Sequence, residues 1–201
     1  EIPLRLVGSE MCIRDRRYIS HDPQMERCLN ALRKGFRDGV SYEDLYQRLI
    51  SQDEYLLLAD YRAYYQAHNC VETRPYDGIG PLLERLRQAG VRTAVVSNKP
   101  DRTTRTLAAR FFPELDGAMG QREGIASKPA PDMVRAALDQ LHAAPEETLY
   151  VGDSEVDVAT ARNAGLDMIG VAWGFRGRAA LEAAGAPLVA DTPEQLLDML
   201  Q

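Results

Sequence analysis

The fold is decided by residues 148–165, TLYVGDSEVDVATARNAG. The run TLYVGD, residues 148–153, is apolar and β-branched up to its glycine, which predicts a buried strand. The run SEVDVATARNAG, residues 154–165, predicts a helix that follows this strand directly. A strand that leads straight into a helix is typical of a β-α unit in a parallel sheet.

The same alternation extends over residues 75–201. The apolar residues within 79–86 form one helical face. This helix is expected to end at Gly90, because glycine is common just after the last turn of a helix. RTAVVS, residues 92–97, follows as a buried strand. Further helices are expected at 104–111, at 131–141 and after Thr192, and further strands at 167–173 and near Leu188. We therefore expect an α/β domain with a parallel sheet over residues 75–201.

The region before this domain has a different texture. The pattern of residues 22–68 predicts helices throughout, with Asp22 and Pro23 as an N-terminal cap and a first-turn proline. A capping-box pattern, SYED, starts at Ser41 and predicts a second helix there. The turn-rich run RPYDG, residues 74–78, marks the end of this region. We expect residues 17–74 to form a separate helical module.

Composition excludes several classes of function. The 201 residues carry a net charge of −6 and no basic stripe, which argues against nucleic-acid binding. No apolar run approaches the roughly 18 residues that a membrane-spanning helix needs. Cys12, Cys28 and Cys70 are odd in number and lack C-x-x-C spacing, so free thiols are expected. These features predict a cytoplasmic protein, a monomer or homodimer, with a small-molecule partner.

Polar residues stand where ligands bind in parallel α/β sheets, at the carboxyl ends of strands. Ser97 and Asn98 end one predicted strand, where a hydroxyl and backbone N–H groups can hold phosphate oxygens. Asp153 ends another, with Asp157 one helical turn later, and two carboxylates so placed suit Mg²⁺. Lys128, in KPAPD, can neutralise phosphate charge. Each also has a structural alternative: a turn at Ser97, a helix cap at Asp153, a surface position for Lys128.

The order strand-SNK, then K-P-x-P, then strand-GD-x-x-x-D resembles the second, third and fourth motifs of the haloacid dehalogenase superfamily, in particular its phosphoglycolate-phosphatase-like members. The resemblance covers residues 75–201, including Trp173-Gly174-Phe175. It implies a Rossmann-like core with a parallel sheet and an α-helical cap inserted after the first strand. This cap would correspond to residues 17–74.

The resemblance also implies an activity. Such proteins are Mg²⁺-dependent phosphatases that act on small phosphorylated metabolites, phosphoglycolate among them, through an aspartyl-phosphate. Carried over to this chain, Ser97 and Asn98 would bind the phosphate and Lys128 would stabilise it. Asp153 would bind Mg²⁺, with Asp157 as a second ligand or as a residue that contacts one. A non-catalytic phosphate-binding protein and a phosphosugar mutase of the same superfamily are the alternatives.

The first motif of the superfamily, D-x-D-G-T, is absent from residues 1–18, so the strand that carries the nucleophile is expected to be missing. Leu6–Asp15, LVGSEMCIRD, resembles the translation of a transposase-type sequencing adapter, and the reading frame fits residues 1–16. We interpret residues 1–16 as foreign to the natural protein; the alternatives are a pseudoenzyme and a circularly rearranged protein. The apolar run Ile2–Val7 is expected to fill the empty place in the sheet, in an unstable chain without phosphatase turnover.

Overall fold

The computed structural model of the chain describes residues 4–8, 13–14 and 73–200. The predicted helical region 22–68 and the three cysteines lie outside the described residues. The chain divides into two compact units, one of residues 1–14 and 74–201 and the other of residues 15–73. The first unit holds every strand and helix that the structure describes.

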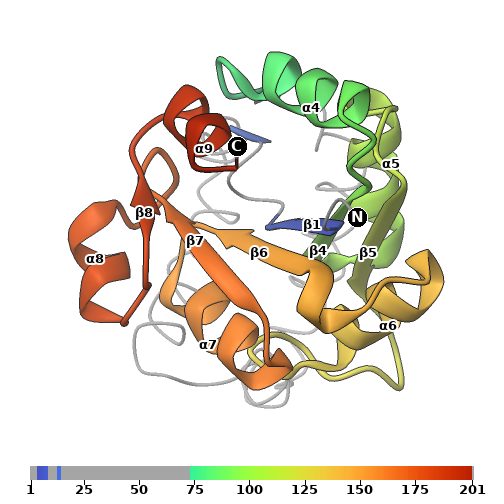
Figure 1. The fold of residues 1–201 in the computed structure, drawn as a ribbon. Helices are drawn as coiled ribbons and strands as arrows, with labels where there is room; N and C mark the ends of the chain where they lie inside the picture. The colour runs from blue at the N-terminus through green and yellow to red at the C-terminus, as the bar shows by residue number, and fades with distance from the viewer. Residues whose placement is uncertain (1–3, 9–12, 15–72, 201) are drawn as a thin grey trace, which may run out of the picture. The chain divides into compact units, whose positions relative to one another are not determined.

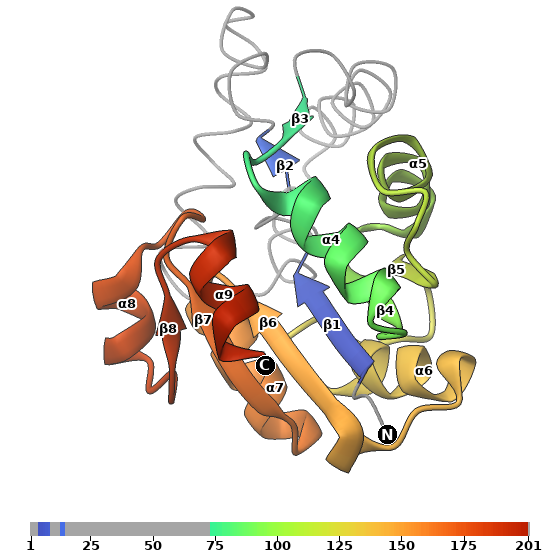
Figure 2. The same cartoon turned by 45° about the horizontal axis from the view of Figure 1, so that its top comes forward.

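A six-stranded parallel sheet forms the centre of this unit, in the order β5-β4-β1-β6-β7-β8 (Figures 1 and 2). Parallel strands need crossover connections, and the β-α alternation of the sequence supplies them. The strands are β1 Leu4–Gly8, β4 Thr93–Pro100, β5 Gly117–Gln121, β6 Thr148–Gly152, β7 Asp167–Val171 and β8 Val189–Ala190. A small antiparallel pair, β2 Ile13–Arg14 with β3 Arg74–Pro75, stands apart from this sheet.

Helices cover both faces of the sheet. In Figure 1, α4 and α9 lie on one side of β1 and β6, and α6 and α7 lie on the other. The main hydrophobic core lies between the strands and α6, α7 and α8, where residues such as Val96, Met133 and Leu181 are completely or almost completely buried. The helices are α4 Ile79–Gln88, α5 Asp101–Phe111, α6 Asp132–Leu141, α7 Glu155–Ala164, α8 Arg178–Ala183 and α9 Pro193–Met199, with a short 3₁₀ turn at Pro145–Glu147.

The first strand of the sheet is the apolar run at the start of the chain. Leu4–Gly8 pairs with β4 on one side and with β6 on the other, with Val7 opposite Val95 and Val151. The place between these strands is therefore filled, as the apolar pattern of residues 2–7 led us to expect. No Asp occurs within this strand.

The predicted elements of residues 75–201 are all present, with shifts at their ends. The strand predicted at 92–97 continues to Pro100, with a break in its register against β5 after Val96. The helix predicted from Thr104 begins at Asp101 instead. The sequence pattern predicts neither β5, GAMGQ, nor α8; β5 contains glycine and has no β-branched residue, so it lacks the usual pattern of a strand.

Asp101 explains the early start of α5. Its carboxylate accepts hydrogen bonds from the Gly120 N–H of β5 (2.9 Å) and from Arg105 one helical turn later (2.7 Å). Partial burial by itself acts to raise the pKa of Asp101, but these bonds and the positive charge of Arg105 outweigh it and hold the pKa below its usual range.

This shift predicts an acid dependence of stability. Because the pKa of Asp101 is lowered on folding, its contribution to stability is complete above the unfolded pKa of about 4 and is lost as the pH falls through the lowered folded value. We expect the D101N variant to lose less stability than the parent chain between pH 5 and pH 3, measured by urea denaturation. Equal losses of stability in D101N and the parent chain would contradict a stabilising Asp101–Arg105 ion pair.

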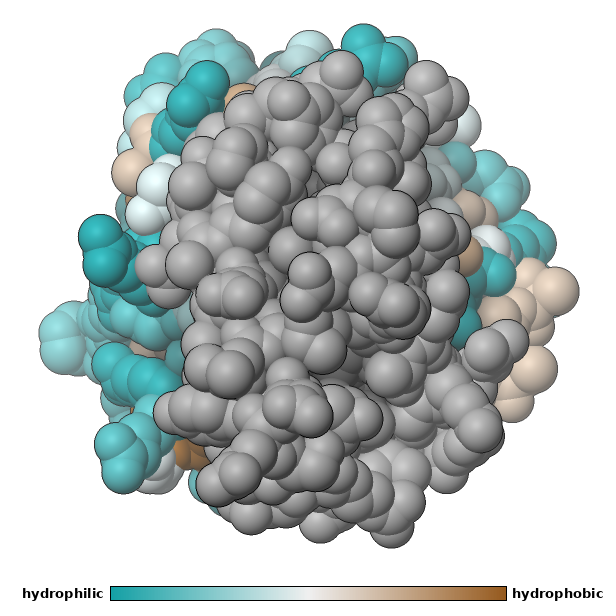
Figure 3. Space-filling model, turned by 180° about the vertical axis from the view of Figure 1, so that it is seen from behind, coloured by the Kyte–Doolittle hydropathy of each residue, from teal (hydrophilic) through white to brown (hydrophobic). Residues whose placement is uncertain are grey.

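The described surface is mostly hydrophilic where it is visible in Figure 3. Among the described residues, the large hydrophobic side chains that stay exposed are Leu188 and Met199. Over residues 4–8, 13–14 and 73–200, no helix combines the length and the apolar character required to cross a membrane.

Candidate functional site

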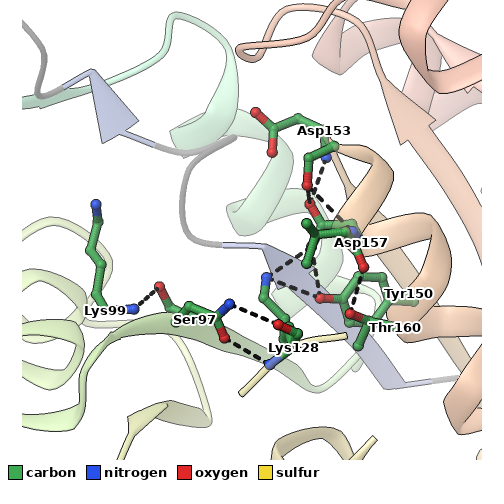
Figure 4. Close-up of polar contacts among 10 residues, drawn as sticks. Ser97, Lys99, Lys128, Tyr150, Asp153, Asp157 and Thr160 are labelled. Carbon is green, nitrogen blue, oxygen red and sulfur yellow. Dashed lines mark hydrogen bonds and ion pairs between the residues drawn. The ribbon is translucent and has the colours of Figure 1, made fainter. Parts of the chain in front are cut away.

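The predicted site residues lie at the carboxyl ends of β4 and β6 and on the loop between β5 and α6 (Figure 4). Ser97 and Asn98 belong to the end of β4, and Asp153 follows β6. Lys128 lies on the loop, and Asp157 lies in the first turn of α7. Parallel strands of one sheet end at the same edge, and β4 and β6 are separated only by β1, so the topology brings these side chains to one place.

An ion pair joins Lys128 to Asp157. The Lys128 Nζ lies 2.8 Å from Asp157 Oδ1, and the two side chains are 9% and 3% exposed. The hydroxyl of Ser154, the N-cap residue of α7, donates to Asp157 Oδ2 (2.6 Å), and the Asp153 N–H donates to the same oxygen (3.3 Å). Both oxygens of the Asp157 carboxylate therefore accept hydrogen bonds from protein groups.

Tyr150 completes this buried network. Its side chain is fully buried on β6, and its hydroxyl donates to Asp157 Oδ1 (3.0 Å) while it accepts from Lys128 Nζ (3.4 Å). Burial, followed by the neighbouring Asp157 carboxylate, raises the pKa of Tyr150 well above its usual value despite the opposing effect of Lys128. The phenol therefore keeps its proton and acts as a donor.

The network keeps Asp157 ionised. Burial is the largest single influence and acts to raise the pKa of this carboxyl. The charge of Lys128 and the hydrogen bonds from Lys128, Ser154 and Tyr150 act in the opposite direction, and together they hold the pKa of Asp157 below its usual range. A charged carboxylate beside a charged ammonium is consequently maintained in a water-poor setting.

Asp153 is held by the loop that follows β7. The side chain is 1% exposed, and its Oδ2 accepts a hydrogen bond from the Phe175 N–H (2.9 Å). A Cβ atom on Gly174 would overlap the Asp153 carboxylate, so only glycine allows this loop to approach so closely. The Trp173-Gly174-Phe175 sequence thus has a direct structural role at the site.

The end of β4 contributes a hydroxyl and an amide. Ser97 is 2% exposed, and its Oγ accepts from the Lys99 N–H (3.1 Å). The Asn98 side chain contacts the backbone of Lys128 twice: its Nδ2 donates to the Lys128 carbonyl (3.0 Å), and its Oδ1 accepts from the Lys128 N–H (2.8 Å). On the next residue, the Pro129 carbonyl accepts from Asn163 Nδ2 of α7 (2.9 Å).

All five predicted site residues are therefore among the described residues. The structure also gives the hydrogen-bond partners of their side chains, which the sequence could not. Asp157, predicted as a possible metal ligand, directs its carboxylate to Lys128, Tyr150 and Ser154. Sequence reasoning missed Tyr150. The available signal was a phenol inside an apolar strand, because a buried Tyr hydroxyl usually needs a hydrogen-bond partner.

The donor set is compatible with Mg²⁺. The described residues contain no group of three or more His, Cys, Asp or Glu side chains that could hold a metal ion. Mg²⁺ does not require such a cage, because it commonly binds through one or two carboxylates and keeps several waters. Asp153 supplies one buried carboxylate beside the Lys128–Asp157 pair, so the residues present fit a metal ion held in this way.

Gly152 offers a test of the close packing between β6 and α7. A Cβ atom at this position would overlap Cβ and Cγ of Asp157, which the start of α7 holds in place. We expect G152A to destabilise the chain by about 2 kcal/mol, because the helix must move away from the strand. Gly80 is the matched control: it is exposed in α4, an added Cβ meets nothing within 4 Å, and G80A should stabilise by about 0.5 kcal/mol. Urea denaturation measures both, and equal effects would contradict the packing.

The chain is similar to known proteins. Residues 31–171 match the family model described as haloacid dehalogenase-like hydrolase. The chain is 34% identical over 139 residues to the N-acetylmuramic acid 6-phosphate phosphatase of Pseudomonas aeruginosa, covering 68% of this chain and 62% of that protein. It is 38% identical over 129 residues to the tyrosine-protein kinase PtkA of Mycobacterium tuberculosis, covering 59% of this chain and 41% of that protein. The chain thus spans less than two thirds of the length of either relative.

A solved structure is similar over nearly its whole length. It is that of a proposed phosphoglycolate phosphatase from Lactobacillus delbrueckii, with a TM-score of 0.80 and 29% sequence identity, covering 98% of this chain and 97% of the other. The family match covers well over half of the chain and includes the strand ends, the Lys128 loop and α7. The chain therefore belongs to the haloacid dehalogenase-like hydrolase family.

Proposed function

We propose that the protein to which this chain belongs is a Mg²⁺-dependent phosphatase that hydrolyses small phosphorylated metabolites in the cytoplasm. The observation that carries the proposal is the buried Lys128–Asp157 pair beside Asp153, at the sheet edge where Ser97 also lies. A cation kept in a water-poor site can balance the charge of a phosphate and of its transfer. Phosphatases among the similar proteins support the same reading.

Each residue has a role in this proposal. The Ser97 hydroxyl and the backbone N–H of Asn98 bind phosphate oxygens, and the Lys128 ammonium stabilises the charge on the phosphate. Asp153 holds Mg²⁺, which when bound would neutralise phosphate charge and orient the substrate. Asp157 positions Lys128, with which it shares its closest charge contact, instead of serving as a direct ligand.

The nucleophile of the proposed reaction is an Asp that would stand at the end of the first strand. In the register of the sheet, Gly8 lies opposite Val96, and Val7 lies opposite Val151. Ser97 is the residue after Val96 on β4, and Asp153 comes two residues after Val151, directly beyond the end of β6. The end of β1 therefore lies between Ser97 and Asp153, the residues to which this proposal assigns phosphate and metal binding. We propose that the natural sequence upstream of Tyr18 supplies the Asp that β1 lacks.

The test is to determine the coding sequence upstream of Tyr18 and to express the protein with it. Phosphate release is then measured from p-nitrophenyl phosphate, phosphoglycolate, N-acetylmuramic acid 6-phosphate and pyrophosphate, with Mg²⁺ and with EDTA. We expect hydrolysis of at least one monoester with Mg²⁺ only, and none from the 201-residue chain. Strong Mg²⁺-dependent hydrolysis by the 201-residue chain itself would refute the assignment of the nucleophile.

A non-catalytic binding protein is the second candidate, since β1 contains no carboxylate. An intact natural N-terminus without D-x-D-G-T, combined with phosphate binding and no turnover, would support it. Transfer of the phosphoryl group to a sugar rather than to water would instead identify a mutase.

A further inference from the structure

We propose that the Asn98 side chain is a positioning residue for Lys128 and does not itself bind substrate. This inference rests on the proposed function, in which Lys128 stabilises the phosphate. The inference gives two parts of Asn98 different roles. The side chain positions Lys128, and the backbone N–H binds the phosphate, as in the proposed function.

The geometry of the Asn98 amide carries the inference. Its Nδ2 and Oδ1 bind the carbonyl and the N–H of one and the same residue, Lys128, at 3.0 and 2.8 Å. Two hydrogen bonds to a single residue fix both its position and the direction of its backbone. They join the end of β4 to a loop 30 residues further along the chain. One of the two N–H donors of the amide and its oxygen are thereby committed to the loop rather than to a ligand.

Other groups hold Lys128 at the far end of its side chain. Asp157 and Tyr150 bind its Nζ, so the residue is tied to β4 by its backbone and to β6 and α7 by its ammonium. Asn163 of α7 holds the adjacent Pro129 carbonyl. The long, flexible side chain of a lysine has many rotamers, and fixing both of its ends reduces them to few. Loss of the Asn98 contacts frees the backbone end and lets the ammonium drift from its place.

This arrangement predicts a kinetic signature. A charge that acts mainly on the transition state lowers kcat when it is misplaced, whereas a lost substrate contact raises KM. A displacement of about 1 Å in a positioned group costs roughly 100-fold in rate. We expect N98A to lower kcat by about that factor and to change KM by less than about threefold.

A double-mutant cycle provides the decisive measurement. N98A, K128A and N98A/K128A are made in the protein that carries its natural upstream sequence, and p-nitrophenyl phosphate is the substrate. If Asn98 acts through Lys128, N98A changes kcat by less than about twofold once Lys128 is absent. The matched control is Q88A, which removes the surface amide that donates to Glu84 at 2.7 Å on α4 and should leave kcat and KM unchanged. Because Asn98 is exposed, we expect N98A to fold.

A second measurement does not depend on turnover. Hydrogen exchange of the Lys128 amide in the 201-residue chain should become about five- to tenfold faster in N98A, because the hydrogen bond to Oδ1 is lost. Unchanged exchange would overturn the inference, as would a rise in KM without a fall in kcat, or equal effects of N98A with and without Lys128. Faster exchange in a natural protein without hydrolysis would support the positioning and contradict only the proposed function.

Discussion

Replacing Asp157 by alanine will destabilise the chain by about 3–5 kcal/mol, because it leaves the Lys128 ammonium buried without its carboxylate. The Lys128 side chain is 9% exposed and cannot regain full hydration without leaving its place. The hydroxyls of Tyr150 and Ser154 lose their acceptor at the same time, which adds to the cost. The free energy of unfolding, from urea denaturation followed by circular dichroism, measures the effect.

The control for this prediction is the double variant K128M/D157L, which replaces both charges by apolar side chains of similar size. Removing a buried pair together is often close to neutral, whereas removing one partner is not. We expect the double variant to recover more than half of the loss caused by D157A. Exposed ion pairs usually contribute no more than about 1 kcal/mol to stability. If the free energy of unfolding of D157A lies within about 1 kcal/mol of that of the parent chain, the ion pair is not buried in solution.

Under the proposed function, replacing Asp153 by asparagine is expected to lower kcat in the presence of Mg²⁺ by about 1000-fold or more, because the carboxylate proposed to hold the metal ion is removed. Metal ions contribute several kcal/mol of charge stabilisation, and each step of about 1.4 kcal/mol is a factor of ten in rate. The amide is nearly the same size as the carboxylate and can still accept from the Phe175 N–H, so the fold should be retained. The rate of phosphate release as a function of Mg²⁺ concentration measures the effect.

Asp167 provides the matched control for D153N. It is an exposed Asp at the amino end of β7, the end of the strand opposite to the site. We expect D167N to leave both kcat and the Mg²⁺ dependence unchanged. Retention of full Mg²⁺-dependent activity in D153N would remove Asp153 from the proposed site, and equal losses in the two variants would point to a general loss of folding.

The positions of Ser97 and Asp153 in the fold could be predicted from the chain because both residues come at strand ends. Ser97 and Asp153 follow apolar runs, and the ends of parallel strands lie together whatever the details of packing. Lys128 was singled out by its place in KPAPD, just before a helix that a proline was expected to start. The first residue of α5 was less predictable, because the Asp101 carboxylate there accepts a hydrogen bond from Gly120 of β5. β5 escaped prediction because its five residues show neither alternation nor β-branched side chains.

The sequence alone determined three features: the alternation of strands and helices, the order of the motifs, and the absence of an Asp from the first strand. Each of them depends on residues that are near one another in the chain. Only the tertiary structure decided that Asp157 pairs with Lys128, that Tyr150 joins them, and that the amide of Asn98 holds the Lys128 backbone. The physical reason is that buried polar groups take the partners that packing brings within reach, and those partners come from distant parts of the chain.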